Sequence, residues 1–264
     1  MPNVKIALQN VGYAYKPPTG QPVRALDGIS LDINENEFVA IVGPSGCGKS
    51  TLLYLVGGFL PLVEGKITVD NCPVSTPGPD RGIVFQHFAL FPWKTVRQNV
   101  LFGLERQDIG PAVRQERAQN IIDLVKLTGF EDVFPSQLSG GMKQRVAIAR
   151  TLVIDPAVLL MDEPFGALDA QTRGILQEEL LAIWTRSRKS VLFVTHDVHE
   201  ATLLADRVVV MTARPGRIKA VLDVKLARPR TAEVIRSAEF AELRDEIWHL
   251  VREEAQHSAG GVRA

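Results

Sequence analysis

Gly43-Pro44-Ser45-Gly46-Cys47-Gly48-Lys49-Ser50 decides the fold, because this stretch matches the pattern GxxxxGK followed by Ser or Thr. It directly follows the apolar run Phe38–Val42 and opens a helical run, Lys49–Leu55. A strand, a glycine-rich loop and a helix in that order form the context that a phosphate-binding loop requires. At ordinary glycine frequencies a chance match in a chain this long is on the order of one in a hundred. We therefore predict a P-loop here rather than a glycine-rich turn with an accidental lysine.

The P-loop predicts a nucleotide site with defined contacts. Glycines let successive backbone N–H groups turn toward a phosphate, and the helix N-terminus adds a partial positive charge. Lys49 is expected to reach the β- and γ-phosphates, and the Ser50 hydroxyl is placed to bind Mg²⁺. Cys47 is expected to contribute its backbone amide rather than its thiol. The nucleotide-binding residues predicted in this segment are Gly43, Pro44, Ser45, Gly46, Cys47, Gly48, Lys49, Ser50 and Thr51.

The rest of the chain alternates apolar β-branched runs with helical patterns, which predicts α/β construction around a largely parallel sheet. The expected core strands are Phe38–Val42, Gly82–Phe85, Val158–Met161, Val191–Thr195 and Arg207–Met211. Short strands separated by turn residues predict an antiparallel side sheet near the N-terminus. They are Val4–Asn10, Ile29–Ile33 and Gly65–Val69.

Helical patterns interrupt the strands in one stretch and close the chain. We expect helices at Thr95–Leu104 and Ala112–Thr128, the second with an apolar stripe. The stripe consists of Ile121, Ile122, Val125 and Leu127. A final amphipathic helix is predicted by the spacing of Phe240, Leu243, Ile247, Leu250 and Val251. The expected organisation is a domain at 1–225, with a helical subdomain inserted at about 90–135, and a helical tail at 226–264.

Composition narrows the class of protein. The chain has 264 residues, and 30 Lys and Arg side chains balance 30 Asp and Glu, which argues against a general nucleic-acid binder. Its longest uncharged run, Ser50–Val63, is too short for a spanning helix. The opening MPNVKIALQN has no secretory signal pattern, and Cys47 and Cys72 have no metal-site spacing. We expect a soluble, cytoplasmic protein.

An acidic pair ends a core strand in the run Val158-Leu159-Leu160-Met161-Asp162-Glu163. Ligands of parallel sheets sit at the carboxyl ends of the strands, so both acids are expected on the phosphate side. Asp162 suits the outer shell of Mg²⁺. Glu163 can accept a proton from an attacking water, which is worth roughly 10²–10⁴-fold in rate. Next to a P-loop, this interpretation is preferred to acids that merely end a strand.

Leu138-Ser139-Gly140-Gly141-Met142-Lys143-Gln144-Arg145 precedes an alanine-rich helical run, Val146–Leu152. A hydroxyl and two glycines at a helix start form a second cradle for an anion. The segment either caps its own helix or binds nucleotide held by another copy of the chain.

Taken in order, the P-loop, LSGG-x-x-QR, a strand ending in Asp-Glu-Pro and a later isolated histidine resemble the ATP-binding cassette (ABC) family over residues 3–225. The resemblance implies an α/β P-loop NTPase fold: an ABC cassette with a RecA-like core, an antiparallel β side sheet and a helical subdomain. It implies an ATPase that uses ATP and Mg²⁺. It also implies a head-to-tail homodimer of cassettes, in which Ser139, Gly140 and Gly141 close on the partner's ATP.

Further roles follow from the resemblance at single positions. Gln86 matches the glutamine that contacts metal and water, which makes Ser50, Gln86 and Asp162 the expected metal ligands. Asp169, in Ala167-Leu168-Asp169, matches the residue that links the two sites, and His196 matches the histidine that senses the γ-phosphate. Tyr15 matches the aromatic that stacks on adenine, with Tyr13 as the competing candidate. Met142 stands where the family usually has Gln, and we expect this to weaken a polar contact at most.

Weaker strings are similar to the nitrate/sulfonate/taurine import ATPases of bacteria. They are Pro79–Gln86, Leu90–Trp93, Thr95–Val100, Ala205–Ile218 and Phe240–Trp248. This branch implies a transmembrane permease as partner, a periplasmic or lipoprotein solute-binding protein acting through it, and no nucleic acid. It also implies peripheral attachment to the cytoplasmic face of the inner membrane. The apolar segment Phe88–Trp93 is either a docking surface for the permease or buried under the helical insertion. The alternative function is a soluble ABC ATPase acting on ribosomes or DNA.

Overall fold

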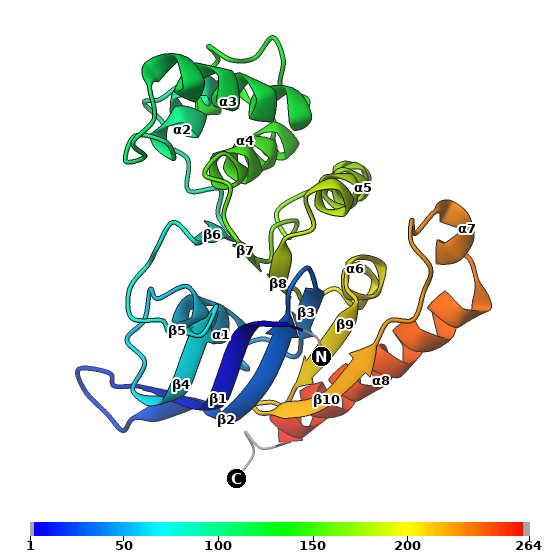
Figure 1. Cartoon of the computed structure of the whole chain (residues 1–264). Coiled ribbons are helices and arrows are strands. Elements are labelled where there is room, and N and C mark those ends of the chain that lie inside the picture. The colour runs from blue at the N-terminus through cyan, green and yellow to red at the C-terminus, as the bar shows by residue number, and fades with distance from the viewer. Residues whose placement is uncertain (1–2, 261–264) are drawn as a thin grey trace. The chain divides into compact units, whose positions relative to one another are not determined.

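The computed structural model describes residues 3–260 and divides the chain into two compact units, whose elements are labelled in Figure 1. The first unit combines Met1–Gly78 with Lys189–Ala264, and the second is Pro79–Arg188. Each unit has its own strands and helices. Residues 90–135, where a helical subdomain is expected, lie within the second unit. Of the expected tail, residues 261–264 lie outside the described part of the chain.

The first unit contains an antiparallel sheet with the strand order β2-β1-β4-β5. Its strands are β1 (Val4–Tyr15), β2 (Val23–Asn34), β4 (Glu64–Val69) and β5 (Cys72–Pro73). In β2, Ile29, Leu31 and Ile33 are buried and alternate with exposed residues, so one face of the strand packs on the core. The predicted side sheet is confirmed, with β1 and β2 longer than expected.

A second sheet in the same unit runs β10-β9-β3-β8. Strands β3 (Phe38–Val42), β8 (Ser190–Val194) and β9 (Arg207–Met211) are parallel, and β10 (Ile218–Asp223) is antiparallel to β9. Every residue of β3 and β8 is buried, as strands covered on both faces require. The helices of the unit are α1 (Lys49–Val56), α6 (Val198–Leu204), α7 (Ala232–Ile235) and α8 (Ala238–Gly260).

Helix α8 is the amphipathic C-terminal helix that the sequence predicted. It packs against α6 and β9, with Phe240 and Ile247 buried. The Phe240 ring meets the His199 imidazole edge-on, with 5.2 Å between the ring centroids. Ahead of α8, the buried Arg230 donates to the Leu203 carbonyl at 2.7 Å, and burial lowers the Arg230 pKa to about 10. The tail therefore caps the C-terminal end of α6 as well as covering its side.

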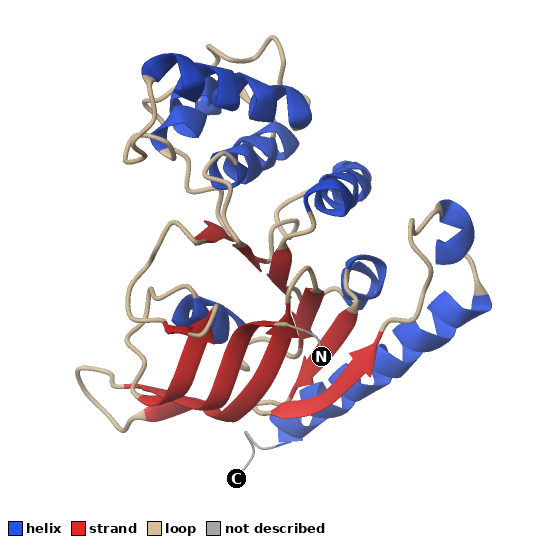
Figure 2. Cartoon of the chain, in the orientation of Figure 1, coloured by secondary structure: helices blue, strands red, loops and turns tan. Residues whose placement is uncertain are grey.

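The second unit contains two parallel strands, β6 (Arg81–Val84) and β7 (Val158–Asp162), and a larger helical part (Figure 2). The helices are α2 (Val96–Phe102), α3 (Pro111–Leu124), a 3₁₀ turn (Pro135–Gln137), α4 (Gly140–Leu152) and α5 (Ala170–Ser187). Helix α3 is shorter than predicted. Val125 and Leu127 are buried but lie beyond its end, because Lys126 adopts a left-handed conformation with φ 57°.

Parallel strands flanked by helices, together with an antiparallel sheet, confirm the predicted α/β class. Within residues 3–260, no helix is both long enough and apolar enough to span a bilayer.

Candidate nucleotide-binding site

The P-loop leaves the buried strand β3 at Gly43 and enters helix α1 at Lys49. Gly48 has φ 99°, a conformation that side chains rarely adopt. A Cβ added there would lie 2.7 Å from Cδ2 of Leu26. Backbone conformation and packing thus both require glycine at this position, and the loop has the strand-to-helix context that the motif predicted.

The Lys49 side chain is hydrogen-bonded to backbone carbonyls of the P-loop. The buried side chain donates from Nζ to the carbonyl oxygens of Gly43 at 2.9 Å and Pro44 at 3.0 Å. An ammonium group therefore lies against the loop at the N-terminus of α1, where the helix dipole is also positive. This combination attracts a polyanion such as a triphosphate.

Cys47 is enclosed within the loop. It is 1% exposed, and its Sγ lies 3.9 Å from Nζ of Lys49. Burial raises the pKa of the Cys47 thiol, which keeps it neutral near pH 7. The thiol is thus a poor nucleophile, and the backbone amide is the group of Cys47 that a phosphate can use.

The structure brings Tyr15 to the P-loop helix. Tyr15 ends β1, and its hydroxyl lies 3.0 Å from Oγ1 of Thr51 in the first turn of α1. Tyr13 meets the Tyr15 ring edge-on, with 5.0 Å between centroids. The Tyr15 ring is half-exposed beside the helix that follows the loop, so it can cover a planar base.

His196 and the P-loop both follow the carboxyl ends of neighbouring parallel strands. In the parallel pair of β3 and β8, Ile41 is opposite Val194, so both strands end together. His196 is exposed in the turn before α6, where Asp197 accepts hydrogen bonds from the backbone N–H groups of His199 and Glu200. This cap fixes the turn that carries the histidine.

Beside His196 there is an open cavity of about 640 Å³ between the start of α6 and helix α8. Its lining includes His196 and His199 on one side and Trp248 and His249 on the other.

The second unit brings Gln86, Asp162 and Glu163 together. Val84 of β6 is opposite Met161 of β7, so Gln86, Asp162 and Glu163 all lie at the carboxyl ends of these two parallel strands. Gln86 Nε2 donates to Glu163 Oε2 at 3.2 Å. Asp162 is only 1% exposed, whereas Glu163 is partly exposed and has φ 43°. Left-handed non-glycine residues of this kind cluster at active sites.

Ser139 and Asp169 cap neighbouring helices. Ser139 Oγ accepts the Met142 N–H at 3.3 Å at the start of α4. Asp169 Oδ1 accepts the Thr172 N–H at 3.0 Å at the start of α5, and this bond lowers the Asp169 pKa. Ser139 therefore caps its own helix, which is one of the two roles that the sequence left open. Capping by one lone pair is compatible with a second contact from the same hydroxyl.

Gly141 lies where the starts of α4 and α5 approach each other. A Cβ added at Gly141 would lie 2.5 Å from Cγ2 of Thr172, so α4 and α5 approach each other closely here. Gly140 is exposed at the first position of α4. Of the two glycines expected to form a cradle, Gly141 is therefore the one that the packing of α4 on α5 requires to be glycine.

The predicted residues fall into two groups. The first unit holds Tyr15, the P-loop residues Gly43, Pro44, Ser45, Gly46, Cys47, Gly48, Lys49, Ser50 and Thr51, and His196. The second unit holds Gln86, Ser139, Gly140, Gly141, Asp162, Glu163 and Asp169. One residue at the P-loop was not predicted: Arg214 donates from Nε to the Gly46 carbonyl at 3.3 Å. Its only sequence signal was the Ala213-Arg214-Pro215-Gly216-Arg217 string.

The oxygen donors fit Mg²⁺. Ser50 offers a hydroxyl, Asp162 a buried carboxylate and Gln86 an amide oxygen, which are hard ligands. Within residues 3–260, no cluster of three or more His, Cys, Asp or Glu side chains could hold a metal alone.

Comparisons with known proteins agree with this geometry. A family model described as ABC transporter matches residues 26–166. An uncharacterized ABC transporter ATP-binding protein of Methanocaldococcus jannaschii is 52% identical, covering 97% of this chain and 94% of that protein. Taurine import ATP-binding protein TauB of Rhizobium johnstonii is 50% identical, covering 86% and 89%. Nitrate import ATP-binding protein NrtD of Synechocystis sp. is also 50% identical, covering 87% and 89%.

The fold is also similar to that of solved cassettes. The dimeric structure of a post-hydrolysis state of the ATP-binding cassette MJ0796, bound to ADP and Pi, matches with a TM-score of 0.73. It is 33% identical, and the match covers 83% of this chain and 99% of that one. Sequence motifs, local geometry and relatives all agree: this chain belongs to the ABC transporter family and is an ATP-hydrolysing cassette of that family.

Proposed function

We propose that this chain is the ATPase subunit of a bacterial importer for a small anionic solute such as nitrate, a sulfonate or taurine. Relatives about 50% identical over most of the chain are named taurine import and nitrate import ATP-binding proteins, which is the observation that carries the proposal. A permease in the membrane would be the direct partner, fed by a periplasmic or lipoprotein solute-binding protein. The cassette would sit peripherally on the cytoplasmic face of the inner membrane.

Two copies, arranged head to tail, would form two composite sites. In each, the P-loop of one copy holds the phosphates of MgATP while Ser139, Gly140 and Gly141 of the other copy close on them. The dimeric form of the similar MJ0796 structure supports this arrangement. Asp169 would link the two sites across the dimer. Tyr15 would stack on adenine, which its contact with Thr51 in the P-loop helix supports.

The hydrolytic roles are divided among several side chains. Lys49 would neutralise phosphate charge, while Ser50, Asp162 and Gln86 hold Mg²⁺. Glu163 would accept a proton from the attacking water, and the hydrogen bond from Gln86 keeps its carboxylate oriented. His196 would contact the γ-phosphate from the turn before α6.

The segment Phe88–Trp93 is the proposed docking surface for the permease. Trp93 is 70% exposed, which argues against burial of the segment under the helices. Arg150 donates to the Ala89 carbonyl at 2.7 Å, and the Phe91 ring packs on Phe102 with 4.5 Å between centroids. The loop is thus held in place while an aromatic side chain stays available to a partner.

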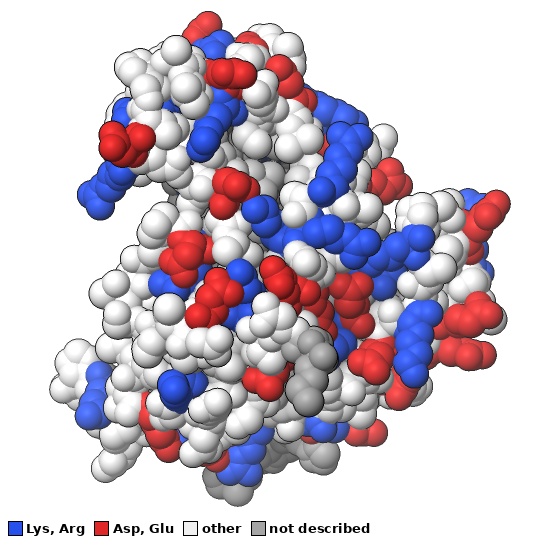
Figure 3. All heavy atoms as spheres, viewed as in Figure 1, with Lys and Arg blue, Asp and Glu red and all other residues white. Residues whose placement is uncertain are grey.

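A soluble ABC ATPase acting on ribosomes or DNA is not favoured. The 30 Lys and Arg side chains balance 30 Asp and Glu, and Figure 3 shows charges of both signs on the face in view. Proteins that bind nucleic acid through its backbone usually carry an excess of basic residues.

Co-expression with a candidate permease, chosen from the genes that lie beside its own, tests the importer assignment. The tagged cassette should recover the permease, and Trp93→Ala should reduce that recovery. Phe130→Ala, which removes another exposed aromatic of the same unit, should not. Membrane vesicles containing the complex should take up labelled nitrate, taurine or an alkanesulfonate only with ATP. Recovery of ribosomes or DNA instead of permease would reject the importer assignment, and the assignment as an ATPase would still stand.

A further inference from the structure

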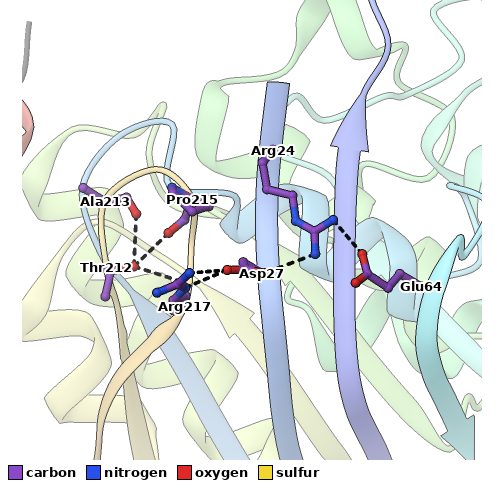
Figure 4. A network of polar contacts seen from close by, with 7 residues as sticks. All are labelled: Arg24, Asp27, Glu64, Thr212, Ala213, Pro215 and Arg217. Atoms are coloured by element: carbon purple, nitrogen blue, oxygen red, sulfur yellow. Dashed lines mark hydrogen bonds and ion pairs between the residues drawn. The ribbon is translucent and has the colours of Figure 1, made fainter. Parts of the chain in front are cut away.

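The loop Thr212–Arg217 joins β9 to β10 and is tied to strand β2 by several bonds (Figure 4). Gly216 donates its N–H to the Ala25 carbonyl at 2.8 Å and accepts the Asp27 N–H at 3.0 Å. Arg217 Nε donates to Asp27 Oδ2 at 2.8 Å. This loop is therefore a fixed part of the first unit rather than a free connection.

The same loop supports the P-loop from outside. Arg214 Nε donates to the Gly46 carbonyl, and a Cβ added at Gly216 would overlap the carbonyl oxygen of Cys47. Two consecutive peptide groups of the P-loop are therefore in contact with this loop. The N–H groups that bind phosphate belong to the same stretch of backbone, so their directions depend on what holds these peptides.

Helix α8 holds the loop in turn. Glu254 Oε2 accepts the Ala213 N–H at 3.0 Å, and Glu254 Oε1 pairs with Lys219 Nζ at 2.8 Å. The Glu254 side chain is 12% exposed, against 59% for the adjacent Glu253, which also pairs with Lys219 at 2.8 Å. A carboxylate this enclosed, with both oxygens used, orients the backbone that it contacts.

We propose that Glu254 is a positioning residue for the P-loop, so that the C-terminal helix sets the affinity for ATP. Its effect passes from Ala213 through the adjacent Arg214 to the peptide of Gly46. Loss of the Glu254 bond loosens Ala213 and Arg214 while Gly216 and Arg217 stay bonded to β2, and the phosphate-binding N–H groups lose part of their preorganisation. The inference rests on the proposed binding of ATP by this P-loop.

Three variants of the full-length chain test this relay by equilibrium titration with MgATP and by steady-state ATPase kinetics. Glu254→Ala should raise the Kd and KM for ATP about threefold to tenfold, which is less than the full worth of a hydrogen bond to a charged acceptor because this bond acts on the P-loop only through the intervening loop. Its kcat at saturating ATP should change less than twofold. Glu254→Gln keeps an oxygen that can accept the Ala213 N–H, so its Kd should lie within about twofold of the original. Glu253→Ala should match the original chain.

A purely structural role for Glu254 would lower the melting temperature without this split between KM and kcat, and without rescue by Gln. Arg214→Ala provides an independent test, because it removes the contact with Gly46 and leaves α8 untouched. It should raise the Kd in the same direction even if Glu254→Ala does not fold. The proposal is overturned if a folded Glu254→Ala binds MgATP as the original chain does, if Glu254→Gln is as weak as Glu254→Ala, or if Arg214→Ala binds MgATP as the original chain does. Failure of the original chain to bind MgATP would instead reject the nucleotide site itself.

Discussion

At the scale of single residues, two adjacent carboxylates have different environments. Asp162 ends the buried strand β7, whereas Glu163 turns away from the strand in a left-handed conformation. The Gln86 amide holds the Glu163 carboxylate at 3.2 Å. This difference is compatible with the proposed roles, in which Asp162 belongs to the shell of a metal ion and Glu163 accepts a proton.

Glu163→Gln should therefore separate binding from hydrolysis. The substitution keeps the shape of the side chain and removes the proton acceptor, so ATP turnover should fall at least about 10²-fold. ATP binding should persist, because Lys49, Ser50 and Asp162 are unchanged, and an ATP-bound dimer should accumulate. Phosphate release and nucleotide titration measure the two effects. Lys49→Ala provides the contrast, since it should lose ATP affinity. Unchanged turnover in Glu163→Gln would rule out the proposed base.

The two cysteines should differ in their reaction with iodoacetamide. Cys47 is buried and burial raises its pKa, so near pH 8 both its reactivity and its access to the reagent are reduced, whereas Cys72 is exposed. We expect Cys72 to be modified first, as followed by peptide mass spectrometry over time. Equal rates at pH 8 would contradict the enclosed P-loop.

At the scale of elements, the sequence predicted what adjacent residues determine. Strand β3, the P-loop and α1 were predicted correctly, because an unbroken apolar run, spaced glycines and a helix start are all local signals. The end of α3 was predicted too late, since the apolar spacing continues past the left-handed turn at Lys126. Helix α5 was not predicted, and it buries a polar residue, Gln177, among its apolar ones.

Other features depend on residues far apart in the chain. The packing of Gly141 on Thr172 and the bond between Ala213 and Glu254 join separate segments. No spacing rule reports such contacts, so the sequence motif suggested an anion cradle at Gly141 and revealed neither its steric role nor Glu254. The roles of all the site residues toward the nucleotide are predictions from the sequence.

The close approach of α4 and α5 predicts the behaviour of Gly141→Ala. A methyl group 2.5 Å from Cγ2 of Thr172 should push the helix starts apart, lowering the melting temperature and the ATPase rate. Adding Thr172→Ser removes the opposing methyl and should restore both. Without the clash, Gly→Ala inside a helix would instead stabilise by up to about 1 kcal/mol. A single variant that melts higher than the original chain would show that the helices do not meet as described.

At the scale of the whole molecule, the motifs are divided between two units. The P-loop and His196 belong to the first, and the carboxylates and the Ser139 segment belong to the second. The central claim is that ATP turnover also requires a second copy of the chain, because Ser139 acts on the partner's ATP. The dimeric ADP-bound relative supports this claim, and complementation between defective variants tests it.

Lys49→Ala removes the charge that holds the phosphates, and Ser139→Arg places a bulky cation in the proposed cradle. Ser139 also caps α4, so the loss of that cap should destabilise by roughly 1 kcal/mol, and thermal unfolding must show that each variant is folded. Neither variant should hydrolyse ATP normally alone. In a mixed dimer, one composite site has both an intact lysine and an intact serine, and the other carries both defects.

The most direct measurement is the ATPase rate of the two variants mixed over a range of protein concentrations. Activity should partly return on mixing and rise with concentration as heterodimers form. Recovery should be incomplete if Asp169 couples the two sites, as proposed. A rate that equals the sum of the two separate residual activities at every concentration would contradict shared sites and leave Ser139 as a helix cap alone.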